Sequence, residues 1–104
     1  MIDARQHIIG KYIPFNFETI TVTNGAIGLT ASILSDDPKP KRAFLTFETA
    51  QCRIRMDGTA PTSTVGHLYN PTQSLLLEGY SQLNNFKAIR TGDNSAKIQV
   101  TYLR

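Results

Sequence analysis

The stretch Ala96-Lys97-Ile98-Gln99-Val100-Thr101-Tyr102 decides the fold class, because every second residue in it is apolar. Successive side chains of a β-strand point to opposite faces, so this alternation predicts a strand with one buried face. The same period of two recurs in three earlier segments: Ile20 with Val22, Ala43 with Leu45 and Phe47, and Cys52 with Ile54 and Met56. No segment predicts a helix longer than about two turns.

Turn-forming residues separate these segments. Asn24-Gly25 is the strongest short hairpin signal, and it predicts two antiparallel strands over about 17–23 and 26–34. The charged, proline-containing segment 35–42 predicts a loop, and so do the turn-rich segments 57–64 and 91–95. The alternation changes phase around Glu48-Thr49-Ala50, which predicts a β-bulge or a tight turn at that point.

The remaining segments complete an all-β pattern. Three consecutive leucines predict a buried strand over 74–78, and 86–89 predicts a further short strand. Between them, 79–85 predicts a single helical turn with Tyr80 and Leu83 directed inward. Seven to nine short strands with frequent turns predict a single antiparallel β-sandwich, either jelly-roll-like or immunoglobulin-like. We expect one domain over residues 1–104, in which residues 1–16 form either its first, edge strand or an N-terminal arm.

Composition excludes several classes of protein. The 104 residues carry a net charge of +3, which is too mildly basic for an arm that depends on phosphate contacts. The sequence contains no run of about 18 apolar residues, so it predicts no membrane span. The N-terminus lacks the basic and apolar regions of a signal peptide. Cys52 is the single cysteine, so no internal disulfide is expected, and with His7 and His67 it does not complete a zinc ligand set.

Residues with catalytic potential are scattered along the chain. Most of the carboxylates fall at turns or on polar strand faces, whereas general acid–base catalysis needs a placed pair of titrating groups. Neither His7 nor His67 has a neighbour that suggests a triad, and Cys52 lies in the apolar phase of its strand. Gly25-Ala26-Ile27-Gly28 lacks the lysine and the following helix of a phosphate-binding loop. We therefore expect no enzyme, no cofactor and no metal.

Basic residues provide the candidate binding site. Arg53 and Arg55 are two positions apart and share one strand face, and Lys41 and Arg42 end the preceding charged loop. These basic residues have three interpretations: a solvated surface, a surface that binds nucleic acid, or a protein interface. The phenylalanines fall mostly in apolar phase, which disfavours stacking on single-stranded nucleic acid. Arginine is common where a planar group pairs with partner carboxylates, so we predict that these four residues contact a protein partner.

A longer pattern spans Phe47 to Ile89. It consists of an Arg-x-Arg strand at 53–55, an Asp-Gly-Thr-x-Pro-Thr loop at 57–62, a Gly-His pair at 66–67 and a closing Phe-x-Ala-Ile strand at 86–89. This pattern resembles a family of small all-β proteins of tailed bacteriophages that are encoded among the virion structural genes. The 57–62 loop alone is also similar to a loop of immunoglobulin-like modules appended to bacterial glycosidases, so it can serve as a folding device.

The bacteriophage resemblance implies a virion component without catalysis. It implies a decoration, or cement, protein that binds the major capsid protein from outside and stabilises the head through many modest contacts. It also implies a homo-oligomer, with a trimer favoured. A head–tail or tail component is the alternative placement. A small carbohydrate-binding β-sandwich module is the alternative of another class, with Tyr12, Tyr69, Tyr80 and Tyr102 as the aromatic residues that could stack on a sugar.

Overall fold

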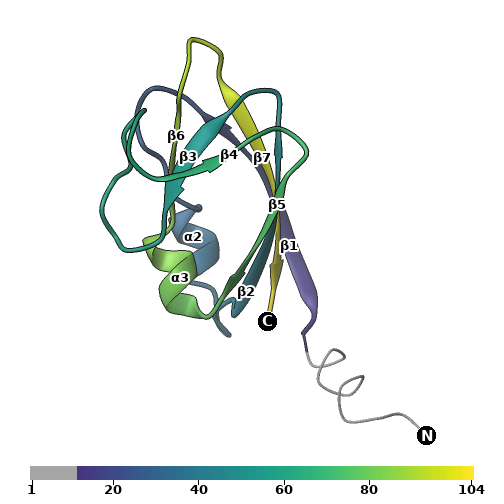
Figure 1. The fold of residues 1–104 in the computed structure, drawn as a ribbon. Helices are drawn as coiled ribbons and strands as arrows, with labels where there is room; N and C mark the ends of the chain where they lie inside the picture. Colours follow the sequence, from purple (N-terminus) through teal and green to yellow (C-terminus); the bar gives the residue numbers. More distant parts are fainter. Residues whose placement is uncertain (1–11) are drawn as a thin grey trace, which may run out of the picture.

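The computed structural model describes residues 12–104, and it is mostly β (Figure 1). Within that range there are seven strands and two short helices. The strands are β1 (Pro14–Val22), β2 (Arg42–Glu48), β3 (Cys52–Arg55), β4 (His67–Tyr69), β5 (Ser74–Glu78), β6 (Lys87–Arg90) and β7 (Ala96–Leu103). The helices are α2 (Ala31–Leu34) and α3 (Tyr80–Asn85). The arm predicted within residues 1–16 falls largely on residues 1–11, which lie outside the described residues, as does His7; residues 14–16 belong to β1.

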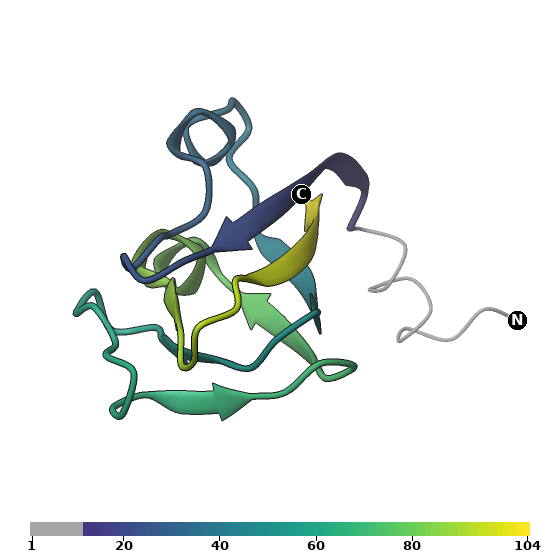
Figure 2. The same ribbon diagram turned by 90° about the horizontal axis from the view of Figure 1, so that it is seen from above.

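The strands form two antiparallel sheets. The first has the order β1-β7-β2-β5, and the second has the order β4-β3-β6. Figure 1 shows them as two layers, and Figure 2 shows from above how the chain passes between them. Ile27 extends the second sheet beyond β6, because it exchanges both backbone hydrogen bonds with Ala88, at 2.9 and 2.8 Å. Helices α2 and α3 lie together at one end of the layers.

The alternating segments bury the faces that their pattern predicts. In β7 the four buried residues are Ala96, Ile98, Val100 and Tyr102. In β2 they are Ala43, Leu45 and Phe47, and in β3 they are Cys52 and Ile54. These side chains form one hydrophobic cluster to which both sheets contribute. The ring of Phe47 stacks on that of Tyr69 from β4, with centroids 4.5 Å apart, so it joins the two sheets directly.

The predicted hairpin at Asn24-Gly25 is wrong. β1 pairs with β7 along its length, and the segment predicted as a second strand over 26–34 contains only the Ile27 bridge and then helix α2. Leu29 and Ile33 are four residues apart, a spacing that suits a helix as well as a strand. A long, strongly alternating C-terminal strand is the better partner for β1, because it buries a complete apolar face against the core.

Three further predictions can be compared with the structure. The phase change at 48–50 is a tight turn in which Thr49 has φ +76°, and it carries the chain from the first sheet to the second. The strand over 74–78 exists, but only Leu77 is buried, because β5 is an edge strand with one face toward solvent. In α3, Leu83 is buried as predicted, whereas Tyr80 is exposed and lies under the ammonium group of Lys39.

One hydrogen-bonded cluster connects β1, β7 and the segment before α2. The Glu18 carboxylate accepts hydrogen bonds from the Tyr102 hydroxyl, the Thr30 hydroxyl and, at 3.3 Å, the Thr30 backbone N–H. Burial, with the hydrogen bond and charge of Glu18, raises the pKa of Tyr102 far above its usual value. Burial also raises the pKa of the Cys52 thiol to about 11. Both groups are therefore held in their protonated forms by the fold.

These two groups predict a loss of stability at alkaline pH. The unfolded chain releases the Cys52 proton near pH 9.0 and the Tyr102 proton near pH 10.0, whereas the folded chain retains both to higher pH. The unfolded state then binds fewer protons, so the free energy of unfolding falls with rising pH, by at most about 1.4 kcal/mol per pH unit and group. Urea midpoints of the wild type should decline from pH 9 upward.

The substitutions Cys52→Ala and Tyr102→Phe assign this pH dependence. Cys52→Ala should flatten the decline between pH 9 and about 11, and Tyr102→Phe should flatten it above pH 10. Both variants lose some stability at neutral pH, so the slope with pH, and not the midpoint itself, is the quantity to compare. Slopes that equal that of the wild type in both variants would contradict the prediction.

Candidate functional site

The 57–66 loop has a defined internal structure. Gly58 has φ +85°, a conformation that favours glycine, and the Asp57 carboxylate accepts the Thr59 N–H at 3.4 Å. The Thr62 hydroxyl accepts hydrogen bonds from the backbone N–H groups of Thr64 and Val65, at 3.3 and 3.0 Å. Asp57, Gly58 and Thr62 therefore shape the loop that the sequence predicts over 57–64.

Arg53 holds this loop against the second sheet. Its Nε donates to the Ser63 carbonyl at 3.2 Å, and its Nη1 donates to the Gly66 carbonyl at 2.9 Å. Gly66 has φ +135°, and a Cβ there would lie 3.0 Å from the Ile54 carbonyl oxygen and 3.1 Å from the Pro61 Cβ. Arg53 is therefore engaged within its own chain, and its removal would release a loop.

Arg55 is also paired internally. It forms a two-pronged ion pair with Asp57, with 3.0 Å between Arg55 Nε and Asp57 Oδ1. The hydrogen bond between them raises the pKa of Arg55 and lowers the pKa of Asp57. Both side chains remain accessible to solvent, so the pair presents a dipolar surface more than a free positive charge.

Two open grooves border the loop. The larger, of about 610 Å³, is lined by the Arg55–Asp57 pair, Met56 and the 65–67 segment, which includes His67. The smaller, of about 270 Å³, lies between the 61–63 segment, Asn24 and the end of β6. No group of three or more His, Cys, Asp or Glu side chains that could hold a metal occurs within residues 12–104.

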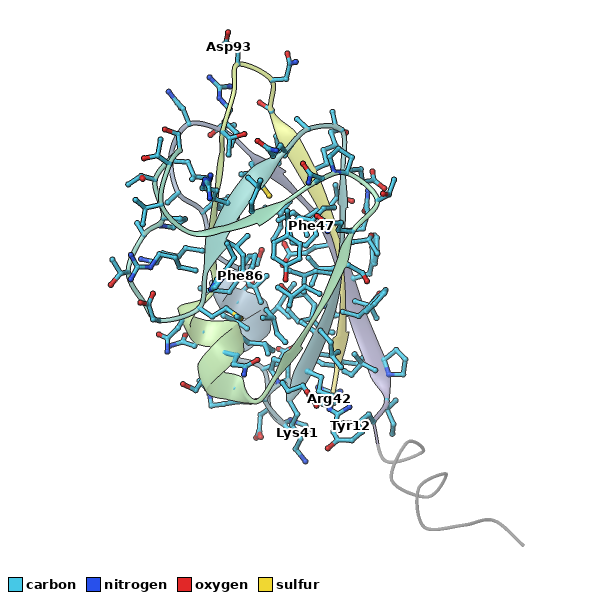
Figure 3. All side chains as sticks on the ribbon, in the orientation of Figure 1. Tyr12, Lys41, Arg42, Phe47, Phe86 and Asp93 are labelled. Carbon is cyan, nitrogen blue, oxygen red and sulfur yellow. The ribbon has the colours of Figure 1, made fainter. Side chains whose placement is uncertain are left out.

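Lys41 and Arg42 lie elsewhere, at the end of the first sheet where β1 begins (Figure 3). Arg42 forms an ion pair with Glu78 at 3.2 Å, and its guanidinium lies 3.9 Å from the centre of the Tyr12 ring. Lys41 is exposed, while its backbone bonds to Leu103 and Gly79. The four predicted contact residues are therefore two separate pairs, one on each sheet.

Two more cations gather near Lys41 and Arg42. Arg104 lies 4.1 Å from the centre of the Phe15 ring and donates to the Pro38 carbonyl at 3.4 Å. Lys39 lies 5.3 Å from the centre of the Tyr80 ring. The sequence predicts Lys39 in a charged loop. Nothing in the sequence around Arg104 predicts that Arg104 lies beside this loop, because the position of Arg104 depends on the pairing between the first and last strands.

A second surface was not expected. The sequence predicts that the phenylalanines lie mostly in apolar phase, but Phe17 and Phe44 are 58% and 45% exposed on the outer face of the first sheet. Leu76, 42% exposed, belongs to the same row, because Phe17 pairs with Thr101, Thr101 with Phe44, and Phe44 with Leu76. The alternation of β2 predicts that Phe44 faces outward, because Phe44 lies between Ala43 and Leu45, which are buried, and neighbouring residues of a strand point to opposite faces.

Comparison with protein family models, curated proteins and solved structures finds no match to this chain. Among the residues that the structure describes, no helix has the length and apolar character to cross a membrane.

Proposed function

We propose that the chain is a jelly-roll β-sandwich. A jelly roll has eight strands, ordered 1-8-3-6 in one sheet and 2-7-4-5 in the other. When Ile27 is counted as a rudimentary second strand, the first sheet has the order 1-8-3-6 and the second has the order 2-7-4-5. The immunoglobulin alternative is less well supported, because its first strand pairs with its second, whereas β1 pairs with β7.

We further propose that it is a non-enzymatic structural protein of a tailed bacteriophage virion, a decoration protein that binds the major capsid protein from outside. The observation that carries this proposal is the unity of the motif that resembles such proteins. Its Arg-x-Arg strand and the 57–66 loop, which contains the Asp-Gly-Thr-x-Pro-Thr sequence and ends at the Gly-His pair, are one hydrogen-bonded unit, because Arg53 donates to the carbonyl groups of Ser63 and Gly66 in that loop. Jelly rolls are common in viral capsids, although fold by itself does not define function.

The arrangement of polar side chains supports a role without catalysis. Arg55 and Asp57 neutralise each other, and the Glu18 carboxylate is occupied by Tyr102 and Thr30. Capsid decoration requires many modest contacts and no reacting group, since repeated weak interfaces add by avidity.

The test is the location of the protein in particles of the phage or prophage that encodes it. Immunogold labelling and quantitative mass spectrometry of purified particles should find many copies distributed over the head. Labelling confined to one vertex or to the tail would instead establish the head–tail or tail alternative. Absence from purified particles would contradict a virion role altogether.

Binding to heads that lack the protein tests the predicted contact residues. Lys41→Glu and Arg55→Glu should each weaken binding by about tenfold if these cations face partner carboxylates. Arg90→Glu is the matched control for Lys41→Glu, because it makes the same change in charge at the end of β6, next to the turn that contains Asp93, and that turn lies at the opposite end of the molecule from Lys41 (Figure 3). Arg53→Glu is unsuitable on its own, because it also frees the 57–66 loop.

A carbohydrate-binding module is the second candidate, and the exposed rings of Phe17 and Phe44 are the observation that favours it. Aromatic side chains on a sheet face can stack on the apolar faces of sugar rings, and jelly rolls include lectin domains. A glycan array probed with the wild type and with Phe44→Ser tests this function. The wild type should bind at least one glycan, and Phe44→Ser should not bind it.

A further inference from the structure

The outer face of the first sheet is an ordered array of four rows. We define it by the residues that point away from the core. From one end to the other the rows are Pro14-Leu103-Arg42-Glu78, Phe17-Thr101-Phe44-Leu76, Thr19-Gln99-Thr46-Ser74 and Thr21-Lys97-Glu48. The second row is the apolar one, and the charged side chains lie in the first and last rows. An apolar centre with a polar rim is the general form of a protein interface.

Several polar residues of this face are bonded to one another. The Thr19 hydroxyl donates to Gln99 Oε1 at 2.6 Å, and Gln99 Nε2 donates to Glu48 Oε1 at 3.1 Å. They are therefore less free to bind the hydroxyl groups of a sugar. Both grooves described above border the other sheet. An extended, pleated face of this kind suits another flat protein surface better than a small ligand.

The second and last rows are complementary to themselves. A two-fold axis parallel to the strands, passing between β7 and β2, brings β1 opposite the partner's β5 and β7 opposite the partner's β2. Phe17 then faces a second Leu76, and Thr101 faces a second Phe44, so each ring meets a smaller side chain. In the last row Lys97 faces a second Glu48, and each such contact occurs twice, as an isologous interface requires.

We propose that this face binds a second copy of the chain about that two-fold axis. The inference does not rest on the proposed virion function. Four strands about 4.8 Å apart and four rows about 6.7 Å apart give a face of about 500 Å² per copy. The total of about 1,000 Å² is at the lower limit for a specific interface, so the dimer is weak, with a dissociation constant in the micromolar range or above.

Sedimentation equilibrium of the full chain from about 5 μM to 1 mM tests the dimer. The average mass should rise from the monomer value of 11.5 kDa toward twice that value as concentration increases. Leu76→Ser should weaken the association at least tenfold. Leu68→Ser is its matched control, because Leu68 is equally exposed, at 42%, but lies in β4 of the other sheet.

A charge exchange tests the axis itself. Lys97→Glu places two carboxylates opposite each other in the proposed dimer, so it should weaken association about tenfold. Adding Glu48→Lys restores opposite charges across the axis and should recover most of that loss. Circular dichroism of each variant checks that the sheet is intact, because Glu48→Lys removes the bond to Gln99.

Three results would overturn this proposal. The first is a mass of 11.5 kDa at every concentration. The second is a trimer mass that Leu76→Ser leaves unchanged. The third is an equal effect of Leu76→Ser and Leu68→Ser. Since none of these measurements involves phage particles, their outcome is independent of the test of capsid binding.

Discussion

Replacing Phe47 with alanine is expected to lower the free energy of unfolding by about 3–5 kcal/mol. Phe47 is almost completely buried near the C-terminal end of β2, and its ring stacks on Tyr69 across the two sheets. Truncation loses the free energy gained by transferring the ring from water into the core. It also leaves a cavity between the two sheets, and the sheets cannot move together to fill it because the strands of each sheet are hydrogen-bonded to one another. The total free energy of unfolding of a domain of this size is about 5–15 kcal/mol, so the substitution would remove much of its stability.

Urea unfolding followed by circular dichroism measures this effect, and Phe44→Ala is its matched control. Phe44 is the same residue type on the same strand, three positions earlier, but it faces solvent. Its truncation should cost less than about 1 kcal/mol at low protein concentration. Equal costs for the two substitutions would mean that β2 does not present its faces as described.

Replacing Gly66 with alanine is expected to cost about 2–3 kcal/mol. Its φ of +135° lies in a region that side chains rarely occupy, and the added Cβ would press against the Ile54 carbonyl oxygen. Relief of that contact moves the Gly66 carbonyl away from Arg53, so the loop also loses one of the two hydrogen bonds that hold it. We therefore expect both lower stability and faster amide exchange within residues 57–66.

Gly25→Ala is the control for this substitution. A Cβ at Gly25 meets nothing within 4 Å, and the residue does not require a positive φ, so the change should stay within about 0.5 kcal/mol. Hydrogen exchange separates the local effect at Gly66 from the global one. Unchanged exchange in the 57–66 loop of Gly66→Ala would show that Arg53 does not depend on Gly66 for its position.

The strands with strict alternation could be predicted because each carries its own evidence. In β7 and β2 every second residue is buried, and the pattern needs no knowledge of the partner strand. The pairing of β1 could not be predicted in the same way. Asn24-Gly25 is a local turn signal, whereas the interactions that override it come from Gln99 and Tyr102, about 80 residues away in the sequence.

The candidate site shows the same division. A spacing of two correctly predicts that Arg53 and Arg55 leave the same face of β3, since the residues before each of them are buried. Their partners could not be predicted, because Ser63 and Gly66 reach Arg53 only when the loop returns across the sheet. The separation of these arginines from Lys41 and Arg42 depends on which sheet each strand joins, which is also a long-range property.

The pairing of the first and last strands also sets the order of events during synthesis. Among the strands within residues 12–104, β7 is the only one to which β1 is hydrogen-bonded, and it also pairs with β2. The backbone hydrogen bonds of β1, and those along one edge of β2, therefore cannot form before Ala96–Leu103 emerges from the ribosome. Topologies dominated by such distant pairings fold slowly, on a time scale of about milliseconds to seconds. Until then the nascent chain exposes the unpaired edges of β1 and β2, and a chain terminated before β7 would keep them exposed permanently, as a substrate for aggregation or proteolysis.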